Sequence, residues 1–354
     1  MRKVNHQELK EVVIRCYETK IPLYIWGRTG IGKSETIREA AKDLAKKLNL
    51  EYYEEVNGKA EGFGLIDVRL SQFDPSDLRG LPYIESTEQK SRWAYPDWLP
   101  KIGQGILFLD ELNLAPPLVQ ASAYQLILDR RLGSYRLPEG WIVIAAGNKL
   151  EDRARTFEMA GPLCNRFVHL ELAVPTIEEW TTWATTHKVD SRIISFLNFK
   201  PSYLFRFDDK IQEKSFPTPR SWGRYCSALI NSLPDSEFNQ TLVASAVGEG
   251  IAVEFTAFLR LTRKIKIKDI LDKPELIKEI SEIDLKYALL SALAEEGKKK
   301  ETFHSVIVCC KYLEPEFATL LLRFLKGSVE DFVKKIQKSP ELVNIIKQYA
   351  KYLL

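Results

Sequence analysis

The stretch GRTGIGKS, from Gly27 to Ser34, decides the fold of this chain. It fits the pattern G-x-x-x-x-G-K-[ST] at every fixed position. The apolar run LYIW precedes it at residues 23–26, and apolar residues recur at helical spacing after it, between residues 37 and 48. A strand, a glycine-rich loop and an amphipathic helix in this order predict an α/β domain with a parallel sheet.

The residue types in this loop are those that hold phosphate groups. Its glycines let backbone N–H groups curve around an oxyanion, and the following helix directs its positive N-terminus toward that anion. The Lys33 ammonium can reach terminal phosphates, and the Ser34 hydroxyl can ligate Mg²⁺. The loop therefore predicts a nucleoside triphosphate site. Its residues are Gly27, Arg28, Thr29, Gly30, Ile31, Gly32, Lys33, Ser34 and Glu35.

A second apolar run, residues 106–109, ends in the carboxylates Asp110 and Glu111. In a parallel sheet this end of the strand lies at the same edge as the phosphate loop. We expect Asp110 to hold the Mg²⁺ shell together with Ser34, and Glu111 to orient and deprotonate the attacking water. The alternative is a pair of carboxylates that only caps a helix.

Three further polar residues are candidates for catalysis. Asn148 follows the strand-like run WIVIAA, where its amide can touch the γ-phosphate and the water, although Gly-Asn pairs also simply form turns. Arg166 precedes the last expected strand and is a candidate arginine finger for a neighbouring subunit, with a surface salt bridge as the alternative. Arg220 begins a helix, which is unfavourable for the helix dipole and indicates an anionic partner, the γ-phosphate.

The pattern of elements changes near Pro175. Before it, strand-like runs alternate with helical patterns, and Thr176 to Glu179 then forms a capping box that opens a series of helices. The expected strands are 23–26, 65–70, 106–109, 141–146 and 167–172. The predicted domains are a nucleotide-binding α/β domain at 1–175, a helical lid at 176–262 and a helical C-terminal extension at 263–354.

Composition excludes several classes of protein. The chain has 354 residues and a net charge of +3, so nothing global demands a nucleic-acid partner. Five scattered cysteines and four isolated histidines show no metal-binding spacing, and we expect the cysteines to be buried thiols in a reducing compartment. No apolar run reaches the length of a membrane span and the start of the chain lacks a signal-peptide core, so we expect a cytoplasmic protein without a membrane partner.

Longer strings of the sequence resemble the MoxR group of AAA+ ATPases. Together they lie between about Pro22 and Leu229, and the resemblance fades through the helical part of the chain. The strings are DVRLSQFDPSDLRGLP, PDWLP, ILFLDELNLAPPLVQASAYQLILDRRLGSYRLPEGW, AAGNKLEDRA, NRFVHLEL and PTPRSW.

This resemblance implies a complete architecture and activity. The fold would be an α/β P-loop NTPase sandwich of the AAA+ type with a helix-2 insert and a pre-sensor hairpin, followed by an all-helical lid and tail. The resemblance also implies ATP and Mg²⁺ as ligands, a hexameric ring with active sites completed between subunits, and chaperone-like remodelling of a protein. Such proteins are often partnered by proteins with a von Willebrand factor A domain.

The resemblance also assigns positions outside the nucleotide loop. Hairpins at 77–98 and 132–140 would face the ring's partner or pore. Leu114 departs from the family, which commonly has arginine there, and Arg130 and Arg131 downstream could substitute for it. Asn57 is a candidate switch that holds Glu111 inactive.

A GTPase is the alternative with the same chemistry. Asp77 to Gly80 imitates a D-x-x-G switch, and Asn148 to Glu151 nearly matches the guanine-reading N-K-x-D. However, Glu151 is one methylene longer than the aspartate that must accept from both guanine nitrogens. Asp77 also lacks the preceding apolar strand, so these motifs favour ATP.

Two other classes of function stay open. A ring motor acting on nucleic acid would find support in the basic runs 263–268 and 298–300, although alternation with isoleucine is more typical of a solvated face. A nucleotide-gated interaction module would use the same Lys33, Ser34 and Asp110 for binding but would hydrolyse slowly. Measured turnover, and its loss in Glu111→Gln, separates that module from an active ATPase.

Overall fold

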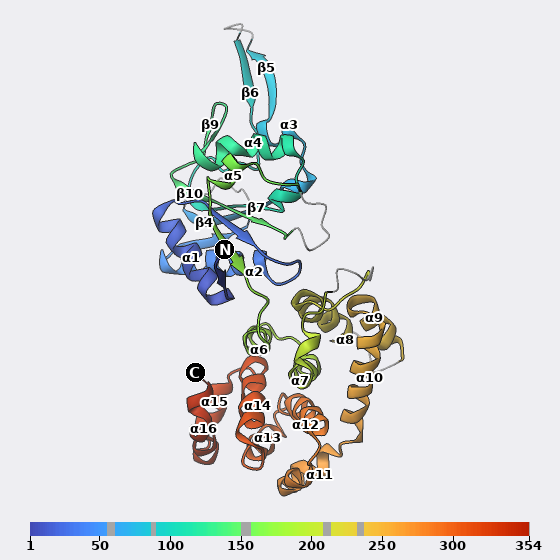
Figure 1. Cartoon of the computed structure of the whole chain (residues 1–354). Helices are drawn as coiled ribbons and strands as arrows, with labels where there is room; N and C mark the ends of the chain where they lie inside the picture. The colour runs from blue at the N-terminus through green and yellow to red at the C-terminus, as the bar shows by residue number, and fades with distance from the viewer. Residues whose placement is uncertain (55–60, 86–89, 150–156, 208–213, 232–236, 354) are drawn as a thin grey trace. The chain divides into compact units, whose positions relative to one another are not determined.

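The computed structural model of the chain contains two compact units, Met1–Val174 and Pro175–Leu354 (Figure 1). It describes residues 1–54, 61–85, 90–149, 157–207, 214–231 and 237–353. The first unit holds the sheet and the second is helical. The further boundary predicted at residues 262 and 263 stays a prediction.

A seven-stranded parallel sheet with the order β1-β11-β2-β10-β7-β4-β3 forms the first unit. Its strands are β1 Lys3–Val4, β2 Leu23–Trp26, β3 Glu51–Tyr53, β4 Gly62–Arg69, β7 Gln104–Asp110, β10 Gly140–Gly147 and β11 Val168–Leu172. The helices of this unit are α1 His6–Thr19, α2 Lys33–Lys47, α3 Pro75–Arg79, α4 Pro117–Leu128 and α5 Gly161–Cys164. The predicted α/β class is confirmed.

The sheet is buried on both faces, which explains its continuous apolar runs. In β7, Leu107 and Leu109 pack in one cluster with residues of α4, while the alternate residues Ile106 and Phe108 are buried on the opposite face. Because all these strands run in parallel, β2, β7 and β10 end at one edge of the sheet. The residues that follow them therefore meet there.

All five predicted strands are present, with small differences in their bounds. The two short strands at the sheet edges, β1 and β3, were not predicted, because runs of two or three residues carry little periodic signal. Two antiparallel hairpins project from the sheet unit, β5 Leu81–Glu85 with β6 Lys90–Ala94 and β8 Arg131–Leu132 with β9 Tyr135–Arg136 (Figure 1). These are the predicted helix-2 insert and pre-sensor hairpin, although Asp77, the predicted first residue of the insert, lies in α3.

The second unit consists of helices around one buried cluster that extends from Trp180 to Tyr349. Thr176 caps α6 as predicted, since its hydroxyl accepts from Glu179 N at 3.2 Å and the Glu179 carboxylate accepts from Thr176 N at 2.9 Å. The helices are α6 Ile177–Thr186, α7 Ser191–Phe199, α8 Ser227–Asn231, α9 Glu237–Val247, α10 Glu249–Lys264, α11 Ile267–Asp272, α12 Ile283–Glu296, α13 Phe303–Cys309, α14 Pro315–Ser328, α15 Phe332–Gln337 and α16 Pro340–Leu353.

The fold tests the prediction that the cysteines are buried. Four cysteines are buried thiols as expected, whereas Cys164 is only half-buried. In the described part of the chain, no helix is both long enough and apolar enough to span a membrane.

Candidate functional site

The glycine-rich loop lies between β2 and α2, at the edge where the central strands end. Gly30 and Gly32 have φ angles of 77° and 104°, a backbone region that residues with a Cβ rarely adopt. His6, the first residue of α1, donates from Nε2 to the Ile31 carbonyl at 2.8 Å and supports the loop from the side. Thr29 is exposed at the loop surface, so a ligand can approach there.

Lys33 is turned onto the loop that precedes it. Its ammonium donates to the carbonyls of Gly27 and Arg28, at 2.6 and 3.0 Å, and to Asn148 Oδ1 at 2.9 Å. All three acceptors are uncharged, so an oxyanion would compete for these donors with stronger, charge-assisted hydrogen bonds. The structure thus brings together Lys33 and Asn148, two residues that lie far apart in the sequence.

Ser34 and Asp110 meet at the same edge of the sheet. The Ser34 hydroxyl donates to Asp110 Oδ2 at 2.9 Å, and Asp110 Oδ1 accepts from Glu111 N at 2.9 Å. Neighbouring oxygen ligands of an octahedral Mg²⁺, each about 2.0–2.1 Å from the ion, are also about 2.9 Å apart. A hydroxyl and a carboxylate at this spacing fit a magnesium ion.

Glu111 follows Asp110 in a left-handed backbone conformation, with φ 57° and ψ 32°. Its carboxylate accepts a hydrogen bond from the Ser71 hydroxyl. Ser71 lies in the 3-10 turn Leu70–Gln72, directly after β4, the strand next to β7. Sequence reasoning missed Ser71, because the adjacency of β4 and β7 is known only from the fold. Asn57, the predicted partner of Glu111, lies outside the described residues.

Asn113 is a second residue that sequence reasoning missed. Its side chain is buried and holds the Asn148 backbone from both sides, because Nδ2 donates to Asn148 O at 2.7 Å and Oδ1 accepts from Asn148 N at 3.1 Å. A Cβ on Gly147 would lie 2.4 Å from Asn113 Oδ1, so only glycine permits this close approach. Asn113 therefore positions Asn148, whose Oδ1 accepts a hydrogen bond from Lys33.

Asp67 in β4 adds an unexpected carboxyl group near the candidate metal ligands. Burial raises the pKa of Asp67 to about 6, and the negative charge of Asp110 acts in the same direction. Arg38 partly opposes this shift from 3.8 Å. The sequence contained no signal for this effect, because it depends on the packing of β4 against β7.

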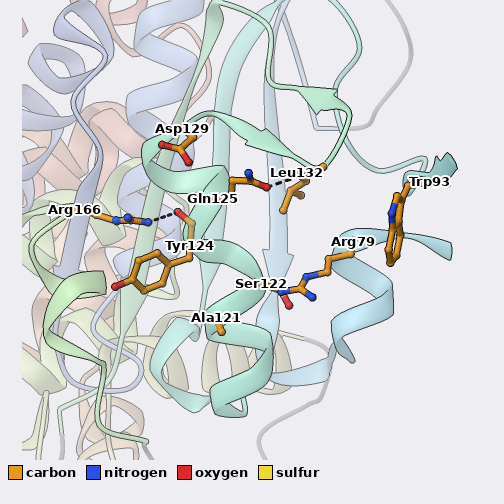
Figure 2. A pocket seen from close by; sticks show the side chains of 10 residues that line it. Arg79, Trp93, Ala121, Ser122, Tyr124, Gln125, Asp129, Leu132 and Arg166 are labelled. Atoms are coloured by element: carbon orange, nitrogen blue, oxygen red, sulfur yellow. Dashed lines mark hydrogen bonds between the residues drawn. The ribbon is translucent and has the colours of Figure 1, made fainter. Parts of the chain in front are cut away.

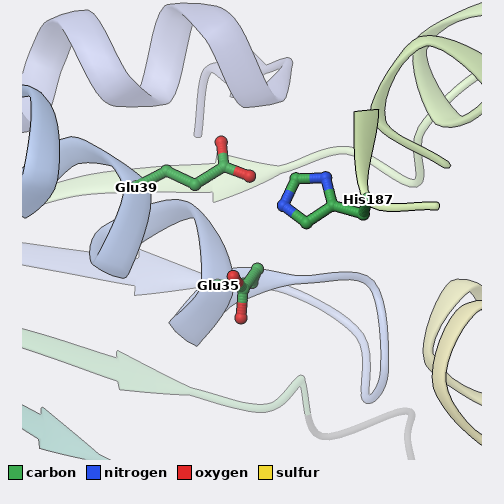
Figure 3. A group of neighbouring side chains, drawn as sticks. All are labelled: Glu35, Glu39 and His187. Atoms are coloured by element: carbon green, nitrogen blue, oxygen red, sulfur yellow. The ribbon is translucent and has the colours of Figure 1, made fainter. Parts of the chain in front are cut away.

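Two carboxylates lie one turn apart at the beginning of α2 (Figure 3). Glu35 pairs with Arg38 at 2.8 Å, and Glu39 pairs with Lys10. Both charges are thus compensated within the sheet unit, and the prediction that Glu35 contacts nucleotide stays a prediction. His187, also drawn in Figure 3, belongs to the helical unit.

The predicted arginines lie on segments other than the phosphate loop. Arg166 packs against α4, where its Nη1 donates to the Tyr124 carbonyl at 2.9 Å. Arg220 is exposed at the start of the helical segment that continues into Ser221–Cys226, in the second unit. Arg130 donates to the Pro138 carbonyl at 2.8 Å, and Arg131 is exposed in β8.

Comparison with known proteins gives a likeness of fold only. No protein-family model matches the chain, and no curated protein matches it. A mutant of RuvB from Thermotoga maritima is 16% identical with a TM-score of 0.36, over 75% of each chain. NtrX from Brucella abortus is similar in complex with ADP, at 16% identity and a TM-score of 0.40, and in complex with ATP, at 14% and 0.39; both matches cover 91% of this chain and 67% of NtrX. At these values the likeness carries no conclusion about activity.

Proposed function

We propose that this chain hydrolyses ATP. The observation that carries the proposal is the meeting of Lys33, Ser34 and Asp110 at one edge of the parallel sheet, beside a loop in which Gly30 and Gly32 have positive φ angles. These are the donors and oxygen ligands that a Mg²⁺-triphosphate requires. Glu111 and Asn148, which follow adjacent strands, supply the polar groups that hydrolysis needs.

Each residue has a distinct task in this proposal. Backbone N–H groups of the loop and the Lys33 ammonium hold the β- and γ-phosphates. Ser34 and Asp110 would hold Mg²⁺, which neutralises phosphate charge when bound. Glu111 orients a water molecule and accepts its proton while the water oxygen bonds to the γ-phosphorus and the bond to the bridging oxygen breaks, giving ADP and phosphate. Asn148 contacts the γ-phosphate and the water.

We infer that the active site is completed by a neighbouring copy in a ring. Arg166 supports this inference, because its guanidinium is anchored on α4, over the Tyr124 ring and on the Tyr124 carbonyl. Arg220 would couple the helical unit to the nucleotide. A hexamer, the MoxR-like remodelling of a protein partner, a von Willebrand factor A domain partner and a cytoplasmic location follow from the sequence resemblance and stay part of the proposal.

The first test is steady-state hydrolysis of ATP and GTP over a wide range of protein concentration. We expect a preference for ATP and a rate per subunit that rises with concentration, since sites completed between copies need assembly. Glu111→Gln should bind ATP and lose turnover, which excludes a contaminating ATPase. A preference for GTP would contradict the proposal.

One observation favours a second candidate, a nucleotide-gated module with slow turnover. The hydrogen bond from Ser71 engages Oε2 of the Glu111 carboxylate, the group that must accept a proton from water. If this bond limits the rate, Ser71→Ala should raise turnover severalfold at unchanged ATP affinity, while the neighbouring variant Gln72→Ala should not. A decrease in Ser71→Ala would instead mean that Ser71 orients Glu111 for catalysis.

A further inference from the structure

The sheet unit contains a cavity that no residue of the phosphate loop lines. A cavity of about 490 Å³ lies on the face of α4 and is also lined from α3, β6 and the turn of the β8–β9 hairpin (Figure 2). Lys33, Ser34, Asp110 and Asn148 are not among its lining residues. Arg166 is, and so is a second arginine, Arg79, the last residue of α3.

Arg166 is held rigidly at one side of this cavity. Its guanidinium carbon lies 3.8 Å from the centroid of the Tyr124 ring, and Nη1 donates to the Tyr124 carbonyl at 2.9 Å. Stacking and one hydrogen bond fix the plane of the guanidinium and leave its other N–H groups as donors. Such a preorganised fork suits an oxyanion, because little side-chain entropy is lost when the anion binds.

Arg79 approaches the same face of α4 from the other side and points toward Ser122 (Figure 2). Within the described ranges of the chain, no carboxylate forms an ion pair with Arg79 or Arg166, and Asp129, which also lines the cavity, pairs with neither. Gln125 adds a donor, since its Oε1 accepts from Gly133 N at 3.1 Å and its NH₂ group is left for a ligand. Two arginines that form no ion pair among the described residues, together with an amide donor, indicate an anion site.

Exposed apolar side chains lie on the elements that line the cavity. Trp93 lines it and is 41% exposed, and Leu118 lies on the same face of α4 as Ser122 and Gln125 and is 72% exposed. On the β5–β6 hairpin, Ile84 shares a face with Trp93 and is 76% exposed. Exposed apolar side chains beside a cationic cavity are typical of a surface that receives a macromolecule rather than a free ion.

We propose that this cavity receives the terminal phosphate of a nucleotide held by a neighbouring copy, and that Arg79 is a second cation acting there beside Arg166. This inference rests on the proposed function, in which Arg166 reaches a neighbour's nucleotide. Because Arg79 ends α3 and Arg166 is anchored on α4, an anion that contacts both also ties α3 to α4. Nucleotide on one copy would thereby stabilise the contact with the next.

The test compares Arg79→Ala with Arg166→Ala, using Arg15→Ala as a control from the exposed surface of α1. Arg79 is itself exposed, so its truncation should leave the fold intact, as circular dichroism would verify. We expect Arg79→Ala to bind ATP normally and to lose about 10²-fold in turnover, less than a primary arginine finger. Arg79→Lys should recover only part of this loss, because an ammonium lacks the bidentate fork. Arg15→Ala should match the unaltered chain.

Mixing of variants distinguishes action between copies from action within one. Lys33→Ala subunits cannot hold nucleotide but offer an intact cavity, while Arg79→Ala subunits hold nucleotide and lack the cavity's second cation. A mixture should hydrolyse ATP well above either variant alone. As a readout apart from activity, ATP-induced association in a Glu111→Gln background, followed by sedimentation velocity, should weaken about tenfold when Arg79 is removed.

The outcomes separate this inference from the proposed function. If Arg79→Ala hydrolyses and associates normally while Arg166→Ala is slow, the ATPase proposal stands and the inference is wrong; the cavity then serves another partner, such as an acidic peptide. Slow turnover that mixing does not restore would mean that Arg79 acts within its own subunit, which also overturns it. Absence of ATP hydrolysis in the unaltered chain would overturn both.

Discussion

The phosphate loop and the cavity on α4 both collect cations for an anion, but they are built in opposite ways. The loop is made of consecutive residues, and its Lys33 is already bound by uncharged oxygens of its own surroundings. The cavity is lined from α3, α4, both hairpins and Arg166, and neither of its two arginines forms an ion pair among the described residues. On the proposals made above, the phosphate loop binds nucleotide with residues of one chain. The cavity binds an anion that a neighbouring copy supplies.

The largest expected effect is at the phosphate loop. Lys33→Ala removes the ammonium that reaches the terminal phosphates, so we expect ATP binding to be lost in equilibrium titration with a fluorescent nucleotide. Lys47→Ala, which removes an exposed lysine from the other end of α2, is the matched control. Unchanged ATP affinity in Lys33→Ala would show that nucleotide binds elsewhere. The phosphate loop could then no longer be compared with the cavity as an anion site.

Arg166→Ala should have the opposite effect to Lys33→Ala, with ATP binding kept and hydrolysis lost. Because Arg166 contacts α4 rather than the phosphate loop, ATP affinity should persist while turnover falls by about 10³-fold. Titration and single-turnover hydrolysis on the same protein measure both quantities. Normal hydrolysis would exclude Arg166 as the finger; Arg131, which is exposed, would then be the next candidate.

Asn113→Ala tests whether the position of Asn148 matters for hydrolysis at the nucleotide site. It removes both hydrogen bonds that hold the Asn148 backbone, so we expect turnover to fall by about tenfold to a hundredfold with little change in ATP affinity. Burial of Asn113 makes some loss of stability certain to accompany this effect. Asn113→Asp keeps the acceptor and loses the donor, and an activity between those of the unaltered chain and Asn113→Ala would identify positioning rather than folding as the cause.

The smallest expected effect is a pH dependence of the folding stability. It arises from Asp67, which lies near the candidate metal ligands of the nucleotide site. The folded pKa of Asp67, about 6, is above its ordinary value of 3.8, so the folded state binds the proton more tightly. The stabilisation from protonated Asp67 should therefore be present below about pH 4 and be lost as the pH rises to about 6. Urea denaturation should give a flatter pH profile for Asp67→Asn, and an identical profile would contradict the raised pKa.

The sequence was most informative where function is local. The fixed positions of the phosphate loop, the strands that end in Asp110 and Gly147, and the two hairpins could all be predicted, because each depends on neighbouring residues and on the period of a single element. Ser71 and Asn113 could not, since a serine or an asparagine in a turn is common. Their roles depend on which strands are adjacent.

By itself, then, the sequence determined the α/β class, the phosphate loop and the identity of the acidic residues beside it. Only the tertiary structure decided that Asn113 clamps Asn148, that Ser71 engages Glu111, and that Arg79 and Arg166 share one cavity. The physical reason is the range of the interactions. Glycine conformations and helix periodicity act over a few residues, whereas hydrogen bonds between strand ends and a cavity lined by two distant arginines exist only after distant segments have packed together.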